Sequence, residues 1–151
     1  MGRTRVLIAD NHSFALGQWS ALLEPEFEVV GAVADGLSLV EASRMLRPDV
    51  VITDITMPML DGLTAAERIL GTAPWTRVVF VTVHADPVLV QRSLQTGAAG
   101  YVLKALAGED LVNALRAVVA GDTFVSELPF DERLAMLTDV IKPGYADLRS
   151  S

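Results

Sequence analysis

Five polar residues stand at the ends of short apolar segments that are typical of buried strands. Two of them are carboxylates, and the others are an amide, a hydroxyl and an ammonium group. Such groups can move a phosphoryl group onto an acid, because phosphoryl transfer depends mainly on positioning and on neutralising charge. The five residues are Asp10, Asn11, Asp54, Thr82 and Lys104.

Most of these groups have a definite task in that chemistry. Asp54 can act as the nucleophile, since aspartyl phosphates are a known use of carboxylates. Asp10 and Asp54 can hold Mg²⁺, which prefers oxygen ligands and keeps several waters. Thr82 and Lys104 can hydrogen-bond and charge-pair with the oxygens of the phosphorylated product.

The segments between these residues predict how the chain brings them together. Five apolar runs indicate strands buried on both faces: 6–9, 28–34, 50–53, 78–83 and 101–103. Segments with helical spacing of apolar residues alternate with them. The alternation predicts a flavodoxin-like α/β fold, a doubly wound five-stranded parallel sheet in the order 2-1-3-4-5 with five helices. The carboxyl ends of these strands share one edge, so the polar residues converge there.

Composition excludes several classes of protein. The chain of 151 residues has a formal net charge of −7 and no cysteine, so neither disulfides nor thiolate metal sites can form. No apolar stretch approaches a membrane span, and residues 1–10 lack a signal-peptide pattern. The acidic balance argues against nucleic acid contact by this chain itself. We therefore expect a cytoplasmic domain without membrane contact.

The chain divides near Gly121. Residues 122–151 are expected to form a linker with a C-terminal helix and a tail. Pro129 can begin a helix, and apolar residues from Phe130 to Ile141 are spaced for one face. Acidic residues outnumber basic ones in this part of the chain.

The motifs around the polar residues resemble the receiver domain of bacterial two-component response regulators. They read VLIADN at 6–11, VITDITMPMLDG at 51–62, VFVT at 79–82 and GAAGYVLK at 97–104. The resemblance covers residues 3–121, which are therefore expected to form the receiver domain. The stretch DTFVSEL at 122–128 is similar to the LuxR-type transcriptional subfamily.

This resemblance implies a role for each matching residue. Asp54 would be the phospho-acceptor, and Lys104 would contact the phosphate. Thr82 and Tyr101 would be the switch pair that re-orients on phosphorylation. Asp10 would belong to the acidic Mg²⁺ site, to which Thr56 would contribute its backbone carbonyl.

Asn11 departs from the family pattern. The family usually has a second acid here, and that acid is commonly a direct metal ligand. An amide oxygen can still coordinate Mg²⁺, but one negative charge is lost. We therefore keep Asn11 among the predicted metal ligands and expect weaker Mg²⁺ binding.

The resemblance also implies partners. A sensor histidine kinase or a phosphotransfer protein would supply the phosphoryl group, and the chain would act as a switch and a homodimer, not as an enzyme. The output would be control of transcription. An acidic tail cannot supply a DNA-recognition helix, so we expect the DNA-binding domain to lie outside this chain.

Alternative functions stay open from the sequence. A pseudo-receiver would bind proteins without being phosphorylated, and Asn11 is its support. A haloacid-dehalogenase-type phosphatase would need an acid where Thr56 stands, together with a cap insertion. A nucleotide-binding module would need a Gly-rich loop after the first strand.

Taken singly, the polar residues have ordinary interpretations. Asp10 or Asn11 could cap the following helix, and Asp61 fits a turn. We expect both histidines to be solvent-exposed, and two methionines to pack around the loop that follows Asp54. These residues are His12, His84, Met57 and Met59.

Overall fold

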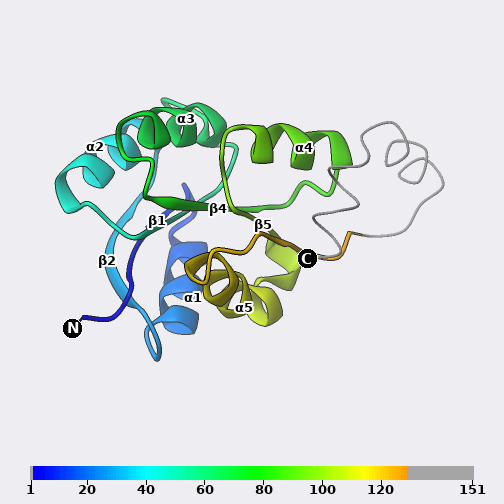
Figure 1. The fold of residues 1–151 in the computed structure, drawn as a ribbon, viewed down its shortest axis with the longest axis horizontal. Coiled ribbons are helices and arrows are strands. Elements are labelled where there is room, and N and C mark those ends of the chain that lie inside the picture. The colour runs from blue at the N-terminus through cyan, green and yellow to red at the C-terminus, as the bar shows by residue number, and fades with distance from the viewer. Residues whose placement is uncertain (1, 129–151) are drawn as a thin grey trace.

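A parallel sheet forms the centre of the molecule in a computed structural model, which describes residues 2–128 (Figure 1). The strands are β1 (Arg5–Ala9), β2 (Glu28–Val33), β3 (Val50–Thr53), β4 (Arg77–Thr82), β5 (Gly100–Leu103) and β6 (Phe124–Val125). The helices are α1 (Ser13–Leu23), α2 (Gly36–Leu46), α3 (Gly62–Thr72), α4 (Pro87–Gln95), the 3₁₀ turn η1 (Lys104–Leu106) and α5 (Ala107–Val119). The strand order is β2-β1-β3-β4-β5-β6.

The helices cover the two faces of the sheet in separate groups. In Figure 1, α2, α3 and α4 lie on one face, and α1 and α5 lie on the other. In β1, Leu7 and Ala9 belong to the core under the first group, and Val6 and Ile8 belong to the core under the second. All four side chains are fully buried, which explains why this strand is a continuous apolar run.

The predicted flavodoxin-like order 2-1-3-4-5 is confirmed, together with the five α-helices of residues 2–128. The prediction of only five strands is wrong, because β6 adds a sixth at the free edge of β5. Phe124 lies opposite Gly100 and Val125 opposite Tyr101 in this parallel pair. A strand of two residues has no periodic pattern that a sequence could reveal.

Loop details agree with the sequence only in part. Met57 is buried as predicted, but the prediction for Met59 is wrong, because its side chain is 73% exposed and its backbone has a left-handed φ of 71°. Gly97 follows α4 with a φ of 99°, as expected for a helix-ending glycine. Gly71 lies inside α3, which ends one residue later, at Thr72.

Gly36 brings the start of α2 against the loop that follows β3. A Cβ atom at this position would overlap the carbonyl oxygen of Leu60, and the Gly36 amide donates to the Pro58 carbonyl at 3.3 Å. Only glycine permits so close an approach of two backbone segments. The contact fixes the loop that begins at Asp54.

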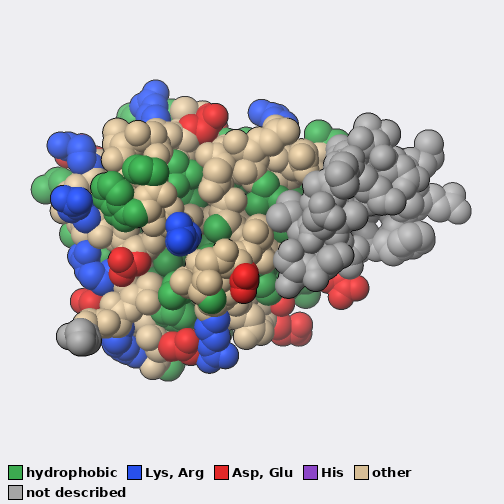
Figure 2. All heavy atoms as spheres, in the orientation of Figure 1, with side chains coloured by type: hydrophobic (Ala, Val, Ile, Leu, Met, Phe, Trp, Pro, Cys, Tyr) green, Lys and Arg blue, Asp and Glu red, His purple; other side chains and the backbone are tan. Residues whose placement is uncertain are grey.

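The surface of the described part carries charges of both signs. On the face shown in Figure 2, Lys and Arg side chains gather on the side of β2 and α2, whereas several Asp and Glu side chains lie along the lower edge. No helix within residues 2–128 is long and apolar enough to cross a bilayer. The predicted C-terminal helix after Pro129 lies outside the described residues.

Candidate functional site

The ammonium group of Lys104 lies between two carboxylates at the carboxyl edge of the sheet. Its Nζ atom is 2.6 Å from Asp10 Oδ2 and 3.0 Å from Asp54 Oδ2. Asp10 comes directly after β1, Asp54 after β3 and Lys104 after β5, so the parallel strands alone bring the three together. Burial lowers the pKa of Lys104, but contacts with the two carboxylates outweigh it and raise this pKa overall.

Asp54 is held in a fixed orientation. Its Oδ1 atom accepts a hydrogen bond from the Ile55 amide at 2.7 Å, and its Oδ2 atom faces Lys104. The residue is only 7% exposed. Asp54 therefore presents one oxygen to the backbone and one to the charged centre of the site.

Asp10 is fully buried, and its two oxygens have different surroundings. Oδ1 accepts from the His12 amide at 2.7 Å and lies 3.0 Å from His12 Nδ1. Oδ2 forms the ion pair with Lys104 but has no hydrogen-bond partner within residues 2–128. The negative charge of this buried oxygen is therefore balanced by Lys104.

The capping interpretation of Asp10 is not supported. The N-cap of α1 is His12, which makes no side-chain capping bond, and Asp10 accepts from that residue rather than from the first turn. His12 is exposed as predicted, but its contact with Asp10 was not predicted from the sequence. Asp61, in contrast, caps α3 by accepting from the Thr64 amide at 2.9 Å.

Thr82 and Tyr101 meet at the same residue of the β4–α4 loop. Thr82 is fully buried, and its Oγ1 accepts from the His84 amide at 3.3 Å. The Tyr101 hydroxyl donates to the His84 carbonyl at 2.7 Å. Burial raises the pKa of Tyr101, and the negative charges of Asp86 and Asp54 raise it further, so the phenol stays protonated.

Residues that could hold a divalent cation fit Mg²⁺ in their chemistry. Asp10 and Asp54 supply hard carboxylate oxygens, one of them without a hydrogen-bond partner. The Thr56 carbonyl accepts no hydrogen bond within residues 2–128 and is free for a metal. Asn11 is exposed, and its side chain likewise makes no hydrogen bond within the described chain.

This donor set is sparse. Residues 2–128 hold no group of three or more His, Cys, Asp or Glu side chains that could bind a metal. An ion here would rely on two carboxylates, with the amide, the carbonyl and waters in its other positions. Mg²⁺ tolerates this because it keeps several waters when bound to proteins.

Gly62 packs the first turn of α3 onto the backbone of Asp54. A Cβ atom at Gly62 would overlap the Asp54 carbonyl oxygen and lie 2.9 Å from Ile55 Cα, and the Gly62 amide donates to the Ile55 carbonyl at 2.6 Å. This contact holds the turn that follows Asp54. Position 62 therefore has to be a glycine for steric reasons.

Gly62→Ala is expected to lower the free energy of unfolding by about 3 kcal/mol, because backbone would have to move. Gly71→Ala is the matched control in the same helix, since a Cβ there meets nothing within 4 Å. That control should raise the free energy of unfolding by about 0.5–1 kcal/mol. Urea denaturation measures both, and equal midpoints would contradict this role of Gly62.

Fold and site together define a class of protein: a doubly wound domain with two buried carboxylates bridged by a lysine at the carboxyl edge of its sheet. A family model described as the response regulator receiver domain matches residues 6–116. The chain belongs to this family, as the motifs predicted.

Curated relatives support the membership of this chain in the receiver-domain family. The chain is 34% identical over 152 residues to the transcriptional regulatory protein MctR of Rhizobium johnstonii, covering 97% of this chain and 71% of that protein. It spans 51–58% of the length of several other curated regulators that it matches.

Solved structures have the same fold. The receiver domain of RcsB from Salmonella enterica serovar Typhimurium, solved in the presence of the phosphomimetic BeF₃⁻, is 31% identical with a TM-score of 0.77, over 83% of this chain and 95% of that one. A LuxR-family two-component response regulator from Aurantimonas is 25% identical with a TM-score of 0.78, over 98% of this chain and 95% of that one. The predicted LuxR-type resemblance is confirmed.

Proposed function

We propose that this receiver domain is a phosphorylation-controlled switch in which Asp54 accepts a phosphoryl group. The observation that carries the proposal is the ion pair of Lys104 with both Asp10 and Asp54. The ion pair places one positive group beside two buried carboxylates at the carboxyl edge of the sheet. It suits a site that must receive three further anionic oxygens.

The reaction needs little covalent chemistry from the protein. Asp54 Oδ2 would attack the phosphorus of a phosphohistidine or an acyl phosphate, forming an O–P bond. The bond from phosphorus to the donor nitrogen or oxygen breaks, and its electron pair leaves with the donor. Lys104, already 3.0 Å from Asp54 Oδ2, is placed to pair with the transferred oxygens.

When bound, Mg²⁺ would neutralise negative charge on the phosphoryl oxygens. Asp10 and Asp54 would hold it, with the Thr56 carbonyl and the Asn11 amide as further oxygen donors. The Asp10 oxygen without a hydrogen-bond partner supports this assignment.

The switch would run through His84. A phosphoryl group at Asp54 would compete for the Thr82 hydroxyl, which now accepts from the His84 amide. Thr82 would turn toward the phosphate and release this amide. The Tyr101 hydroxyl, bonded to the carbonyl of the same residue, would then lose its fixed partner. The β4–α4 loop and β5 would thus change together.

Partners would reach the site across its loops. Three exposed apolar side chains come from the loops and the helix start that follow β1, β3 and β4: Phe14 at 77%, Met59 at 73% and Val83 at 70%. An apolar rim around a charged centre suits a helix that carries a phosphohistidine. We propose that this domain acts in the cytoplasm, with a sensor histidine kinase or a phosphotransfer protein as the donor and a homodimer as the active form.

The output is proposed to be control of transcription. MctR and two other curated relatives are transcriptional regulatory proteins by name, and this chain spans between 51% and 71% of their length. With a net charge of −7, the chain itself is not expected to contact DNA. A DNA-binding domain in the same protein would do so.

Intact-mass analysis of the wild-type protein tests the proposal. Incubation with acetyl phosphate and Mg²⁺ should add the mass of one phosphoryl group, and omission of Mg²⁺ should slow the addition strongly. No adduct even at high Mg²⁺ would favour the pseudo-receiver, which Asn11 supports. Rapid turnover of many substrates without an adduct would favour a hydrolase.

Asn11→Asp is expected to tighten Mg²⁺ binding by roughly tenfold, because it adds one negative charge beside Asp10. A Mg²⁺ titration that monitors the fluorescence of Trp19 measures this affinity. The centroid of the Trp19 ring lies 5.9 Å from Lys104 Nζ. Gln18, exposed on α1, offers Gln18→Glu as a control with the same charge change. Equal affinities of Asn11→Asp and wild type would contradict the assignment of Asn11.

A further inference from the structure

Ser126 is a buried polar residue that the phosphorylation chemistry does not use. It follows β6 directly and is only 1% exposed. Its hydroxyl accepts a hydrogen bond from the Leu103 amide at 3.1 Å and donates one to Asp110 Oδ2 at 2.6 Å. A buried serine with both a donor and an acceptor partner is fully satisfied, and it joins the elements that carry those partners.

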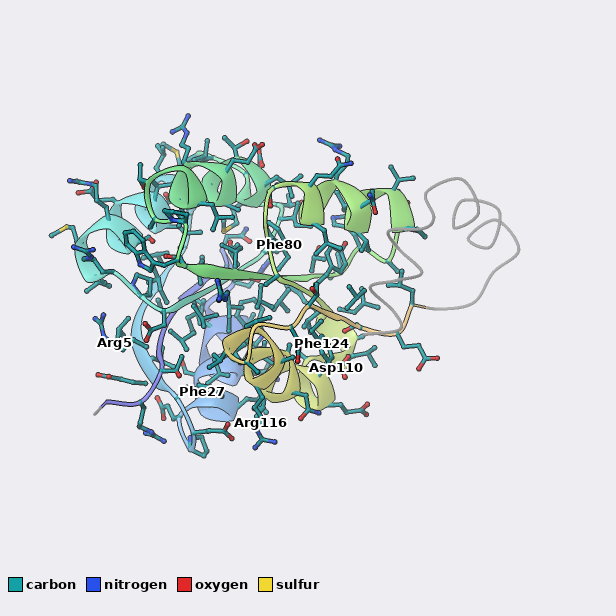
Figure 3. The ribbon with its side chains drawn as sticks, viewed as in Figure 1. Arg5, Phe27, Phe80, Asp110, Arg116 and Phe124 are labelled. Carbon is teal, nitrogen blue, oxygen red and sulfur yellow. The ribbon has the colours of Figure 1, made fainter. Side chains whose placement is uncertain are left out.

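These two partners flank the segment that contains Lys104. Leu103 ends β5 and directly precedes Lys104, and Asp110 stands in the first turn of α5. The Ser126 hydroxyl therefore bonds to the residues on either side of residues 104–109, a segment that includes η1. Figure 3 labels Asp110 on α5 and Phe124 of β6, two elements that pack against each other.

Residues 124–128 also contact β5, the strand that contains Tyr101. The Ser126 amide donates to the Tyr101 carbonyl at 2.8 Å, and Val125 pairs with Tyr101 in the sheet. Leu128, two residues further, is buried in the core under α2, α3 and α4. Residues 124–128 are thus joined to β5 at Tyr101, which the proposed switch uses, and at Leu103, which directly precedes Lys104.

We propose that Ser126 is a positioning residue for Lys104, and that it couples the phosphorylation site to the chain that follows β6. The inference rests on the proposed function. By holding both ends of the Lys104 segment, Ser126 keeps the ammonium group between Asp10 and Asp54. Any shift of Lys104 or Tyr101 on phosphorylation would in turn change the hydrogen bonds of Ser126, because such coupling is reciprocal.

The test compares three variants of the full chain with wild type. Ser126→Ala removes the hydroxyl, and Ser126→Thr keeps it. Ser93→Ala is the matched control, since Ser93 is fully buried and its hydroxyl bonds only the Leu89 carbonyl of its own helix. We expect Ser126→Ala to slow the acetyl phosphate reaction about tenfold through misplacement of Lys104. Ser126→Thr should recover most of this loss, and Ser93→Ala should react like wild type.

Amide hydrogen exchange gives a second readout that does not depend on the reaction. The Leu103 amide should exchange about tenfold faster in Ser126→Ala, because its acceptor is gone. In wild type, beryllium fluoride as a phosphoryl mimic should change the exchange of the Ser126 amide. This second measurement needs no variant, so it tests the coupling even if Ser126→Ala does not fold.

The outcomes separate the two proposals. An adduct in wild type, with Ser126→Ala reacting as fast as Ser93→Ala and no exchange response at Ser126, would overturn the role of Ser126 and leave the proposed function intact. Absence of an adduct in wild type would overturn both. Slow reaction of Ser126→Ala with rescue by Ser126→Thr would support the inference.

Discussion

Asp54→Asn is expected to reduce phosphorylation by acetyl phosphate below detection. The amide has nearly the shape of the carboxylate, and its oxygen can still accept from the Ile55 amide, so the turn is preserved. An amide is not a nucleophile under these conditions, and the variant also loses the negative charge that would help hold Mg²⁺. Phosphorylation should therefore be lost in Asp54→Asn, while the fold is kept.

The stability of Asp54→Asn should stay close to that of wild type. Lys104 keeps its ion pair with Asp10 at 2.6 Å, so no buried cation is left without a partner. Thermal unfolding followed by circular dichroism checks this point.

Asp61→Asn is the matched control for Asp54→Asn, because Asp61 caps α3 outside the charged site and asparagine caps helices equally well. It should be phosphorylated like wild type. Phosphorylation of Asp54→Asn at the wild-type rate would show that another residue is the acceptor.

Lys104→Met is expected to slow phosphoryl transfer by about 10²–10³-fold, because one preorganised positive group is lost from the transition state. Methionine preserves much of the apolar stem of the lysine side chain, so the main change is the loss of charge. Single-turnover labelling with acetyl phosphate at saturating Mg²⁺ measures the rate.

The same variant should bind Mg²⁺ more tightly. The Lys104 ammonium stands next to both carboxylates and competes electrostatically with a bound cation. Slower transfer together with tighter Mg²⁺ binding is a pair of changes that misfolding cannot produce. If Lys104→Met bound Mg²⁺ more weakly than wild type, the arrangement of charges described above would be contradicted.

Lys104→Met should also be destabilised in the absence of metal by about 3 kcal/mol, since two largely buried carboxylates lose their common cation. Added Mg²⁺ should restore part of this stability, because a ligand that binds the folded state alone stabilises it. Urea denaturation with and without Mg²⁺ measures both effects.

The sequence predicted the architecture well because the strands are buried on both faces. A continuous apolar run such as residues 6–9 predicts a central strand, and β1 differs from it by only one residue, Arg5. Once the parallel order is known, the contact of Lys104 with Asp10 and Asp54 follows from where β1, β3 and β5 end. Convergence of side chains at one sheet edge is a property of the fold, not of any local pattern.

Other features depend on tertiary contacts that leave no local signal. Nothing in the spacing of Thr82 and Tyr101 indicates that both bind His84, because the contact depends on the path of the β4–α4 loop. The need for glycine at position 62 is visible only once α3 is seen against the Asp54 carbonyl. Ser126 resembles an ordinary linker serine until its partners on β5 and α5 are known.

Identification of the phosphorylated residue tests the central claim most directly. The wild-type protein would be treated with acetyl phosphate and Mg²⁺, and the acyl phosphate then reduced with borohydride, which converts a phosphorylated aspartate to homoserine. Peptide mass spectrometry would locate the product. We predict homoserine at position 54 and at no other aspartate. Homoserine at Asp10 or Asp61, or none in a protein that carries the phosphoryl mass, would contradict the assignment of Asp54 as the acceptor.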